Sequence, residues 1–419
     1  MTAKKATTPF EFRRHDKNET KLTDGIDMQK LLMSGHIHAL VPDAEVTLTF
    51  KNRTEIPIGE YIDRDVLRSE FAAISKQGFA DEEIDYFETL GLFGKDFIEF
   101  LKSIILPEVI IGNKNPMEIS VTGDWKSVTF WETVIMSIVN ERYFEALMCR
   151  NSNDLNEVYS EGSRRLDAKI KILKSRPDIK FAEFGTRRRF SYEWHEHVVS
   201  RLVAEVPENL LGVSNIWLAK KFDIPPIGTF AHEMPMVYAG LADRGESSIR
   251  ASHGKFIDDW FGQYGEPLSI ALSDTFGSDF FFDELTTQQV DQWRGFRHDS
   301  GDPILFGEKA INFYVNHGID PKDKTLVFSD GLDIDTIVRL QDHFGERIDT
   351  VYGWGTNLTN DLGPRAVSHV MKATHVNGTP TVKLSDNSNK FTGPKEQVER
   401  YAKIFGYDID NANAVETRY

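Results

Sequence analysis

The chain has 419 residues, of which 40% are hydrophobic and 27% charged, and this length is typical of two or three packed units. Its formal net charge of −16 argues against general nucleic-acid binding, although a local cationic pocket can still hold a small anion. Cys149 is the only cysteine, so no intrachain disulfide forms, which fits a reducing compartment. The start is polar and no window approaches about 18 uninterrupted apolar residues, so we expect a cytoplasmic protein without membrane association.

Residues 1–145 are predicted to form an N-terminal α/β domain that begins with a charged, flexible arm at residues 1–22. "VTLTF" at 46–50 alternates as a strand does, and "MEISVTG" at 117–123 is typical of a second strand. Helical spacing of apolar residues predicts the helices of this domain, and the last of them is apolar around most of its circumference. These helices are expected at 63–77, 82–105 and 128–148.

From about residue 178, short apolar runs end in small or polar residues and are followed by helical stretches. Repeated strand-then-helix order predicts a parallel sheet, and seven such units favour a complete or partial β/α barrel, which we assign to residues 146–395. Residues 396–419 are expected to form a helix and tail that pack on either domain. The runs are 180–187, 209–215, 225–232, 268–274, 295–302, 325–331 and 349–355, and helices are expected at 191–206, 247–264, 304–317 and 333–344.

In parallel α/β folds, active sites form where the carboxyl ends of strands meet, so polar side chains at these ends are expected to face one cavity. His232 in "GTFAHEMPM" follows the third run. It is not part of a zinc-protease HExxH sequence, because Met236 occupies the second histidine position. From the local sequence alone, a packed core histidine is the more frequent explanation for His232.

"EFGTRRR" places three arginines directly after the first run. One or two of them could line the cavity and bind a phosphate through bidentate hydrogen bonds, while a solvated cationic corner is the alternative. Phe184, just before this turn, is either a core residue or a stacking platform.

"FRHDSGDP" combines the cation Arg297 with the carboxylate of Asp299, which could accept hydrogen bonds from both hydroxyls of a ribose. The alternative explanation is structural, because Asp302 could cap the following helix. "FSDGLD" repeats the theme with Ser329 and Asp330 at the next strand end. Two such motifs at successive strand ends favour a sugar-phosphate site.

"YGWGTN" supplies Gly353, Gly355 and Thr356, whose backbone N–H groups and hydroxyl suit a phosphate. It is not the dinucleotide fingerprint, because Leu358 occupies the third glycine position. The sequence also contains no P-loop and no G-x-S-x-G nucleophile motif.

In their order along the chain, "EFGTRRR", "GVSN", "GTFAHEMPM", "FRHDSGDP", "FSDGLD", "GWGTNL" and "VKLSDNSNKFTGP" resemble the nicotinate phosphoribosyltransferase family. The resemblance is strong over residues 180–395, and "TFKNRT" and "FWETVIMSIVNE" extend it toward the N-terminus. It implies a type II phosphoribosyltransferase with an α/β N-terminal domain and an irregular β/α barrel. The implied reaction joins nicotinate to phosphoribosyl diphosphate, giving nicotinate mononucleotide and diphosphate in NAD salvage, with coupled hydrolysis of ATP.

The resemblance implies that His232 is a catalytic residue that ATP phosphorylates, with Mg²⁺ held mainly by substrate phosphates and with no identifiable protein ligands. A neutral imidazole is a competent nucleophile toward a phosphoryl group. The resemblance also implies that Phe184 stacks on the pyridine ring, and that Arg187 and Arg297 bind the ring or its carboxylate and the phosphates. Asp299, a second catalytic residue, and Asp330 would bind the ribose, and Gly355 and Thr356 the 5′-phosphate. Ser329 and Gly353 are the further substrate-binding residues implied.

Two positions bear on the substrate and on assembly. Ser214 stands where nicotinamide-using relatives carry an aspartate, so a serine that avoids repelling a carboxylate predicts the acid as substrate. Gln29 occupies the position of a family tyrosine that stacks on the ring in a partner subunit's site, and Phe12 is a candidate substitute. A shared site implies a homodimer. The alternatives are the same chemistry on nicotinamide or another pyridine base, and a nucleotide-sensing protein without turnover.

Overall fold

The computed structural model describes residues 21–409 except 115 and 152–153. The predicted arm therefore lies outside the described residues apart from its last two positions, and Phe12 lies outside them as well. Leu22, at the end of that arm, is buried and begins the short helix η1 (Leu22–Gly25). No helix within the described ranges has the length and apolar content needed to cross a membrane.

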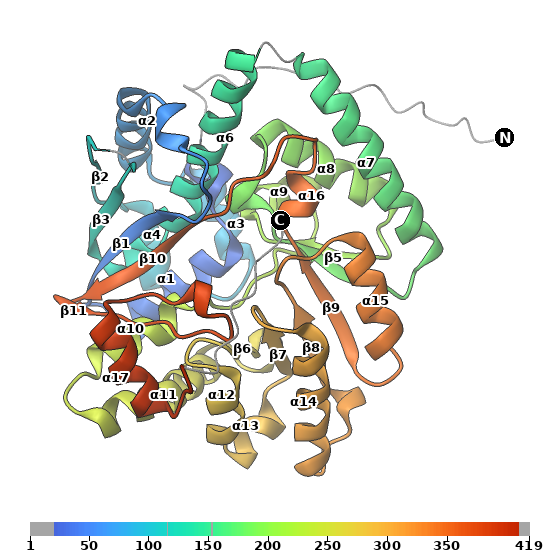
Figure 1. The fold of residues 1–419 in the computed structure, drawn as a ribbon. Coiled ribbons are helices and arrows are strands. Elements are labelled where there is room, and N and C mark those ends of the chain that lie inside the picture. The colour runs from blue at the N-terminus through green and yellow to red at the C-terminus, as the bar shows by residue number, and fades with distance from the viewer. Residues whose placement is uncertain (1–20, 115, 152–153, 410–419) are drawn as a thin grey trace.

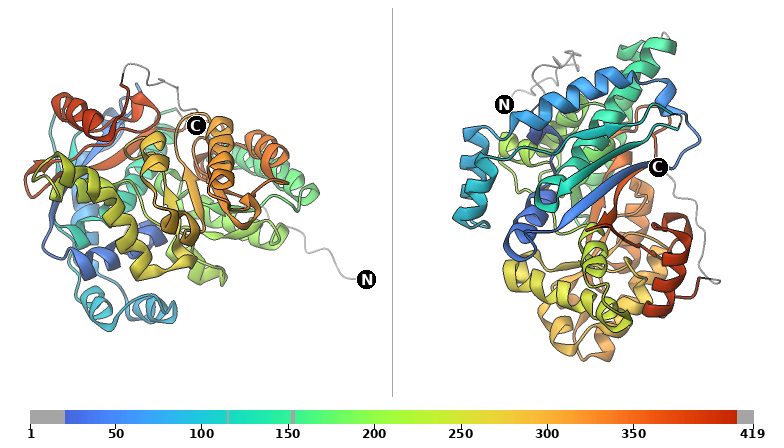
Figure 2. Two further views of the ribbon diagram at one scale, coloured as in Figure 1. Left: turned by 90° about the horizontal axis from the view of Figure 1, so that it is seen from below. Right: turned by 90° about the vertical axis from the view of Figure 1, so that its left-hand side faces the viewer.

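Two sheets form the framework of the molecule (Figure 1). The first is antiparallel, and its blue and teal strands lie side by side in the right-hand view of Figure 2. The second is parallel and holds the polar strand ends. The antiparallel sheet has the order β11 (Thr379–Pro380), β10 (His369–Val376), β1 (Glu45–Asn52), β3 (Ile119–Asp124), β2 (Val109–Ile111), and the parallel sheet has the order β5 (Leu210–Val213), β4 (Phe181–Glu183), β9 (Asp349–Trp354), β8 (Thr325–Phe328), β7 (Gly295–His298), β6 (Ile270–Leu272).

The helices of the N-terminal region largely follow the predicted periodicity. The expected helix over 82–105 is wrong in one respect, because it is divided into two helices between residues 89 and 95. Gly91 has a φ of 66°, a left-handed conformation that ends the first helix, and Gly94 is the N-cap of the second. The helices are α1 (Met28–Leu40), α2 (Arg64–Gln77), α3 (Asp81–Thr89), α4 (Lys95–Lys102), α5 (Trp125–Val128) and α6 (Trp131–Asn151).

In the parallel sheet, six of the seven predicted runs form strands. The prediction of a strand at 225–232 is wrong: this segment makes a single bridge, from Pro226 to Val213. Two consecutive prolines lack the N–H groups that a central strand must donate, which explains the difference. The helices are α7 (Leu155–Ser175), α8 (Tyr192–Glu205), α9 (Ile216–Phe222), α10 (Glu233–Leu241), α11 (Glu246–Tyr264), α12 (Ser278–Glu284), α13 (Thr287–Gln292), α14 (Pro303–Asn316), α15 (Ile334–Phe344), α16 (Thr356–Thr359) and α17 (Lys395–Phe405).

Strand β10 connects the two halves of the molecule. It lies within the range 146–395 predicted for the barrel domain, yet it pairs with β1 of the N-terminal sheet, as Figure 1 shows for the orange and blue strands. One hydrophobic cluster includes buried residues of both sheets, so the halves share a core. Helix α17 packs on α11 in a second cluster. The barrel-side cavity is therefore closed on one side by the N-terminal sheet.

Gly295 tests how closely β7 and β8 are packed. A Cβ at this position would lie 1.9 Å from the carbonyl oxygen of Thr325 on β8, so Gly295→Ala must displace the strands. We expect this substitution to lower the free energy of unfolding by about 1–3 kcal/mol, the usual effect of overpacking.

The matched control is Gly254→Ala within α11, where no atom lies within 4 Å of the added Cβ. It should raise the free energy of unfolding by about 0.5–1 kcal/mol, because alanine is the better helix former. Denaturant unfolding of both variants measures the difference, and a Gly295→Ala protein as stable as the wild type would contradict the packing described.

Candidate active site

A single cavity lies at the carboxyl ends of the parallel strands and collects most of the side chains that the sequence singled out. Ser214 is the exception, because it is buried beside Asp27 and is not among the residues that line the cavity. The predicted residues that line the cavity are Phe184, Arg187, His232, Arg297, Asp299, Ser329, Asp330, Gly353, Gly355 and Thr356.

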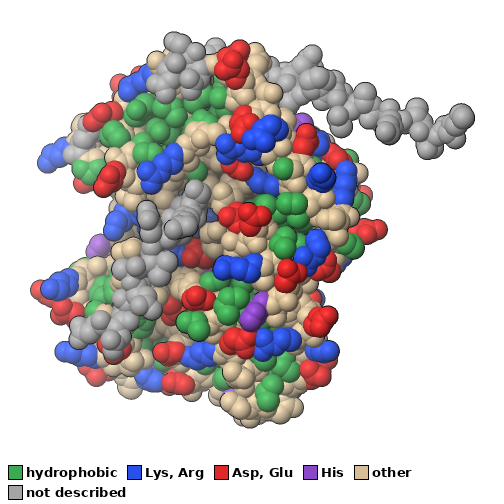
Figure 3. Space-filling view, turned by 45° about the vertical axis from the view of Figure 1, so that its right-hand side comes forward, with side chains coloured by type: hydrophobic (Ala, Val, Ile, Leu, Met, Phe, Trp, Pro, Cys, Tyr) green, Lys and Arg blue, Asp and Glu red, His purple; other side chains and the backbone are tan. Residues whose placement is uncertain are grey.

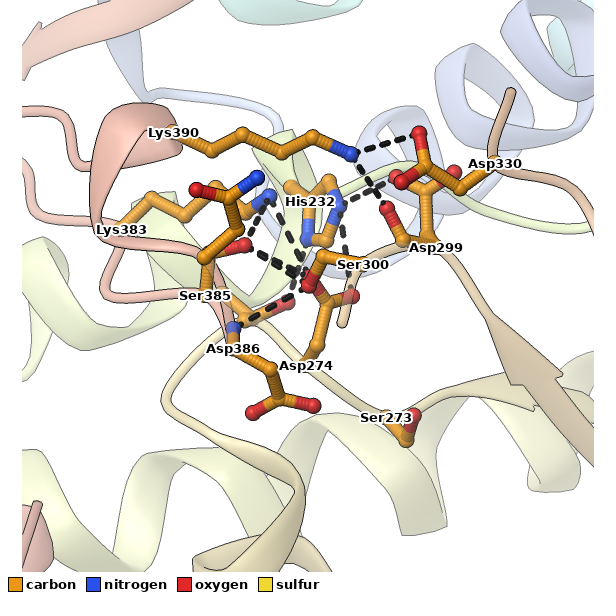
Figure 4. Close-up of polar contacts among 12 residues, drawn as sticks. His232, Ser273, Asp274, Asp299, Ser300, Asp330, Lys383, Ser385, Asp386 and Lys390 are labelled. Atoms are coloured by element: carbon orange, nitrogen blue, oxygen red, sulfur yellow. Dashed lines mark hydrogen bonds and ion pairs between the residues drawn. The ribbon is translucent and has the colours of Figure 1, made fainter. Parts of the chain in front are cut away.

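His232 is the N-cap residue of α10, and two hydrogen bonds hold its ring, of which Figure 4 shows the one to Asp299. Its Nδ1 lies 2.9 Å from Thr275 Oγ1, and its Nε2 lies 2.9 Å from Asp299 Oδ2. Burial, together with the charge of Lys383, lowers the pKa of His232 to about 4 despite two nearby carboxylates. The imidazole is therefore neutral at physiological pH, and the Thr275 hydroxyl can serve either tautomer because it both donates and accepts.

Asp299 is an anion fixed by groups from three segments. Burial acts to raise its pKa, but the hydrogen bond from His232 and the charge of Lys390 hold that pKa well below its usual range. Ser329 Oγ donates to Asp299 Oδ1 over 3.1 Å, and Lys390 Nζ donates to Asp330 Oδ1 over 2.7 Å. Figure 4 shows both carboxylates at one side of His232. Two carboxylates with free lone pairs at this edge can accept hydrogen bonds from a diol.

Asp274 is a residue that sequence reasoning missed. It ends the run "LSIALSD" just after β6, and its Oδ1 lies 3.6 Å from His232 Nε2. Lys383 Nζ is 3.4 Å from Asp274 Oδ2, and Ser385 Oγ donates to the same oxygen. Burial acts to raise the pKa of Asp274, but the charges of Lys383 and His232 hold it well below its usual range. Its position at a strand end was the available signal.

His232, Asp274 and Asp299 place ligand atoms within 4.8 Å of one another, the spacing of a possible cation site. The charges of this cluster are, however, already balanced by the ammonium groups of Lys383 and Lys390. Asp299 is the only member that lies partly open to the cavity, with a side chain 31% exposed. These residues fit a divalent cation that keeps most of its ligands from phosphate and water, with Asp299 as its contact to the protein.

The three consecutive arginines have different environments. Arg187 and Arg188 line the cavity, and Arg187 Nη1 lies 3.4 Å from Glu132 Oε1. Arg189 is buried away from the cavity and donates to Glu141 over 2.7 Å. The expectation that one or two of these arginines face the cavity therefore agrees with this geometry.

Arg297 extends from β7 to the cavity floor, where its Nη2 donates to the carbonyl oxygen of Phe230 over 2.9 Å. Its buried Nε has no hydrogen-bond partner among the described residues. An unsatisfied buried donor is costly, so this guanidinium is prepared to bind an acceptor that enters the cavity.

The turn after β9 comes close to Phe184. A Cβ on Gly353 would lie 2.7 Å from the Phe184 ring, which would have to move, and one on Gly355 would lie 3.0 Å from the Phe184 carbonyl oxygen, so the backbone packs tightly at both positions. On the other side of this turn, Lys169 Nζ forms an ion pair with Asp361 Oδ2 at 2.6 Å. The backbone between residues 353 and 356 is thus exposed to the cavity and held in place.

Ser214 occupies a different position from the one we expected. Its Oγ donates to Asp27 Oδ1 over 2.9 Å, so a carboxylate already lies beside it. Burial raises the pKa of Asp27, although Thr186 and Arg187 oppose the shift. Gln29, two residues on, lines the cavity of its own chain. The family tyrosine position thus faces the site within a single chain.

The cavity concentrates positive charge on an acidic protein. Figure 3 shows basic and acidic side chains interspersed over one outer face. Among the described residues that line the cavity, by contrast, the cations outnumber the two carboxylates of Asp299 and Asp330. These cations are Arg53, Arg187, Arg188, Arg297, Lys372, Lys383 and Lys390. The cavity therefore suits a ligand with several negative charges.

Comparisons with known proteins agree with this geometry. Residues 179–409 match the nicotinate phosphoribosyltransferase (NAPRTase) family, and residues 25–140 match the NAPRTase N-terminal domain. A nicotinate phosphoribosyltransferase from Vibrio cholerae is 30% identical, covers 93% of this chain and 94% of its own, and superposes with a TM-score of 0.85. The enzyme from Porphyromonas gingivalis is 27% identical over 92% of this chain and 100% of its own, with a TM-score of 0.83. The chain belongs to the nicotinate phosphoribosyltransferase family and has its type II phosphoribosyltransferase fold.

Proposed function

We propose that this protein transfers the 5-phosphoribosyl group of phosphoribosyl diphosphate to nicotinate and couples the transfer to hydrolysis of ATP. The observation that carries the proposal is a neutral, doubly hydrogen-bonded His232 at the edge of a cation-rich cavity. Membership of the family supplies the substrate class. NAD salvage in the cytoplasm is the corresponding cellular role.

The cavity divides into regions that match the parts of the substrates. Phe184 offers a ring face for the pyridine, and Arg297 offers an unpaired donor for a carboxylate or phosphate oxygen. Asp299 and Asp330 accept hydrogen bonds from the ribose hydroxyls, and the turn at Gly355 receives the 5′-phosphate. In the transfer, the pyridine nitrogen bonds to ribose C1 as the bond from C1 to the diphosphate oxygen breaks.

His232 is the proposed acceptor of the γ-phosphoryl group. Its contact with Asp299 is partly open to the cavity, whereas its contact with Thr275 is buried, so Nε2 is the nitrogen that an incoming phosphoryl group can reach. Because the Asp299 anion can only accept, Nε2 carries the proton in the hydrogen bond between them, and Nδ1 accepts from the Thr275 hydroxyl. For attack, the incoming phosphoryl group must displace Asp299 from Nε2, and the ring proton must lie on Nδ1 with Thr275 as its acceptor. ADP leaves as the N–P bond forms. A phosphoryl group there adds negative charge that Lys383 and Lys390 can offset.

Mg²⁺ would bind together with the phosphates of ATP and phosphoribosyl diphosphate, and it would neutralise phosphate charge during transfer. Asp299 is the residue placed to contact it. A homodimer stays a prediction. The family resemblance implies it through a ring-stacking tyrosine from a partner subunit, but position 29 lines the cavity of its own chain and carries glutamine.

Substrate choice tests the proposal through steady-state kinetics with nicotinate, nicotinamide and quinolinate. We expect the highest kcat/KM for nicotinate. Ser214→Asp places a second carboxylate beside that of Asp27, and their mutual repulsion of about 1–4 kcal/mol should disturb Asp27 and its neighbour Arg187, which lines the cavity, so kcat/KM for nicotinate should fall at least about fivefold. Ser214→Asn, which is similar in size and uncharged, is the matched control. Equal or better turnover of nicotinamide by the wild type would contradict nicotinate as substrate.

Phosphorylation of His232 is tested by intact-mass measurement after incubation with Mg-ATP at neutral or basic pH, followed by peptide mapping. We expect one added phosphoryl group on the wild type and on His375→Ala, an exposed histidine on β10. His232→Ala should show no added mass and no stimulation by ATP, while a slow transfer without ATP persists. ATP stimulation of His232→Ala at the wild-type level would refute the assignment.

A further inference from the structure

Lys372 reaches the cavity from the antiparallel sheet rather than from the parallel sheet. Along β10, Met371 and Ala373 pack into the core, whereas Val370 and Lys372 line the cavity. Strand β1 pairs with β10 and ends just before Arg53, which also lines the cavity. The N-terminal sheet therefore adds two basic side chains, Arg53 and Lys372, to the cavity lining.

The surroundings of Lys372 contain more positive than negative charge. Arg53 after β1, Arg187 in η3 (Thr186–Arg188) and Lys383 after β11 all repel its ammonium form, while Glu132 of α6 attracts it. Within the described part of the chain, Lys372 makes no hydrogen bond and no ion pair that would fix its charge. An ammonium group in this position is unfavourable until an anion arrives.

The one attractive carboxylate is already engaged. Glu132 lies 2.5 Å from Lys30 Nζ and 3.4 Å from Arg187 Nη1. Helix α10, which also packs on β10, carries Glu233, and this carboxylate binds Lys30 and the indole of Trp125. Both neighbouring carboxylates therefore form ion pairs with Lys30, and neither forms one with Lys372.

These conditions have a direct consequence for protonation. Burial, followed by repulsion from Lys383, Arg53 and Arg187, lowers the pKa of Lys372 to about 7, although Glu132 opposes the shift. Near physiological pH the side chain is therefore a mixture of amine and ammonium. A nearby phosphate would reverse the balance, because an opposite charge favours the charged form.

We propose that Lys372 is a proton-coupled anion receptor, whose neutral amine takes up a proton from solvent as the diphosphate group of phosphoribosyl diphosphate binds. The inference rests on the proposed function and deepens it. Lys383 repels the ammonium form of Lys372 and contacts Asp274 beside His232, and the 5′-phosphate is assigned to the turn after β9, so we assign this group of basic side chains to the diphosphate. Substrate binding would thereby create the charge that holds the diphosphate.

The direction of the pH dependence follows from linkage. The complex carries more protons than the free protein, so affinity is greatest below about pH 7 and falls as pH rises through the pKa of free Lys372. Above that pH, the dissociation constant should increase by up to about tenfold per pH unit from this one group.

The test is calorimetric titration of the full-length protein with inorganic diphosphate at pH 8, in buffers of different ionisation enthalpy, which counts the protons taken up. Lys372→Arg keeps a permanent charge, so it should bind diphosphate and take up fewer protons than the wild type, by up to about one per site. Lys372→Met should show the same loss of uptake and weaker binding. Lys51→Arg, an exposed lysine on β1, is the matched control and should match the wild type.

The outcomes separate the two proposals. Equal proton uptake by wild type and Lys372→Arg, with diphosphate bound by both, would overturn the role of Lys372 and leave the proposed function intact. A wild-type protein that binds neither diphosphate nor phosphoribosyl diphosphate would overturn both. Subtracting the variant from the wild type removes the protons that diphosphate itself exchanges, because both proteins bind the same ligand.

Discussion

The whole site depends on holding mutually repelling cations in one cavity of an acidic protein. Arginine and lysine side chains reach it from both sheets, and each would be more stable in water. They remain together because buried carboxylates offset part of their charge: Glu132 pairs with Lys30 and Arg187, and Asp274 pairs with Lys383. The shared hydrophobic core of the two sheets supplies the rigidity that this arrangement requires.

The same balance of burial and charge explains why the imidazole of His232 is neutral. Burial disfavours the imidazolium, and Lys383 adds to that effect, so two nearby carboxylates do not suffice to charge the ring. Asp299 and Thr275 nevertheless fix its orientation. A neutral ring with fixed nitrogens beside cations is suited to accepting a phosphoryl group and then stabilising it.

The fold was predictable where local pattern and tertiary structure agree. Alternation predicted β1, and the runs that end in polar residues predicted six of the parallel strands. The seventh predicted strand, at 225–232, does not form, because Pro225 and Pro226 have no N–H group to donate to a neighbouring strand. This local constraint outweighed the apolar pattern. No local signal indicated that β10 pairs with β1, because strand partners more than 300 residues apart in the sequence depend on tertiary packing.

The candidate site was predictable for residues at parallel strand ends, since topology alone brings these ends together. Asp274 met the same criterion and was overlooked. Lys372 and Arg53 could not be found in this way, because they come from the other sheet. For Ser214, the sequence indicated the position but not its contact with Asp27, which only the folded chain reveals.

The most direct measurement of the central claim is the titration of His232 by NMR of protein labelled at histidine, with its signal assigned by comparison with His232→Gln. The account predicts a neutral ring throughout the physiological range, with a pKa of about 4. A ring that titrates near 6.5, the ordinary value for histidine, would contradict it.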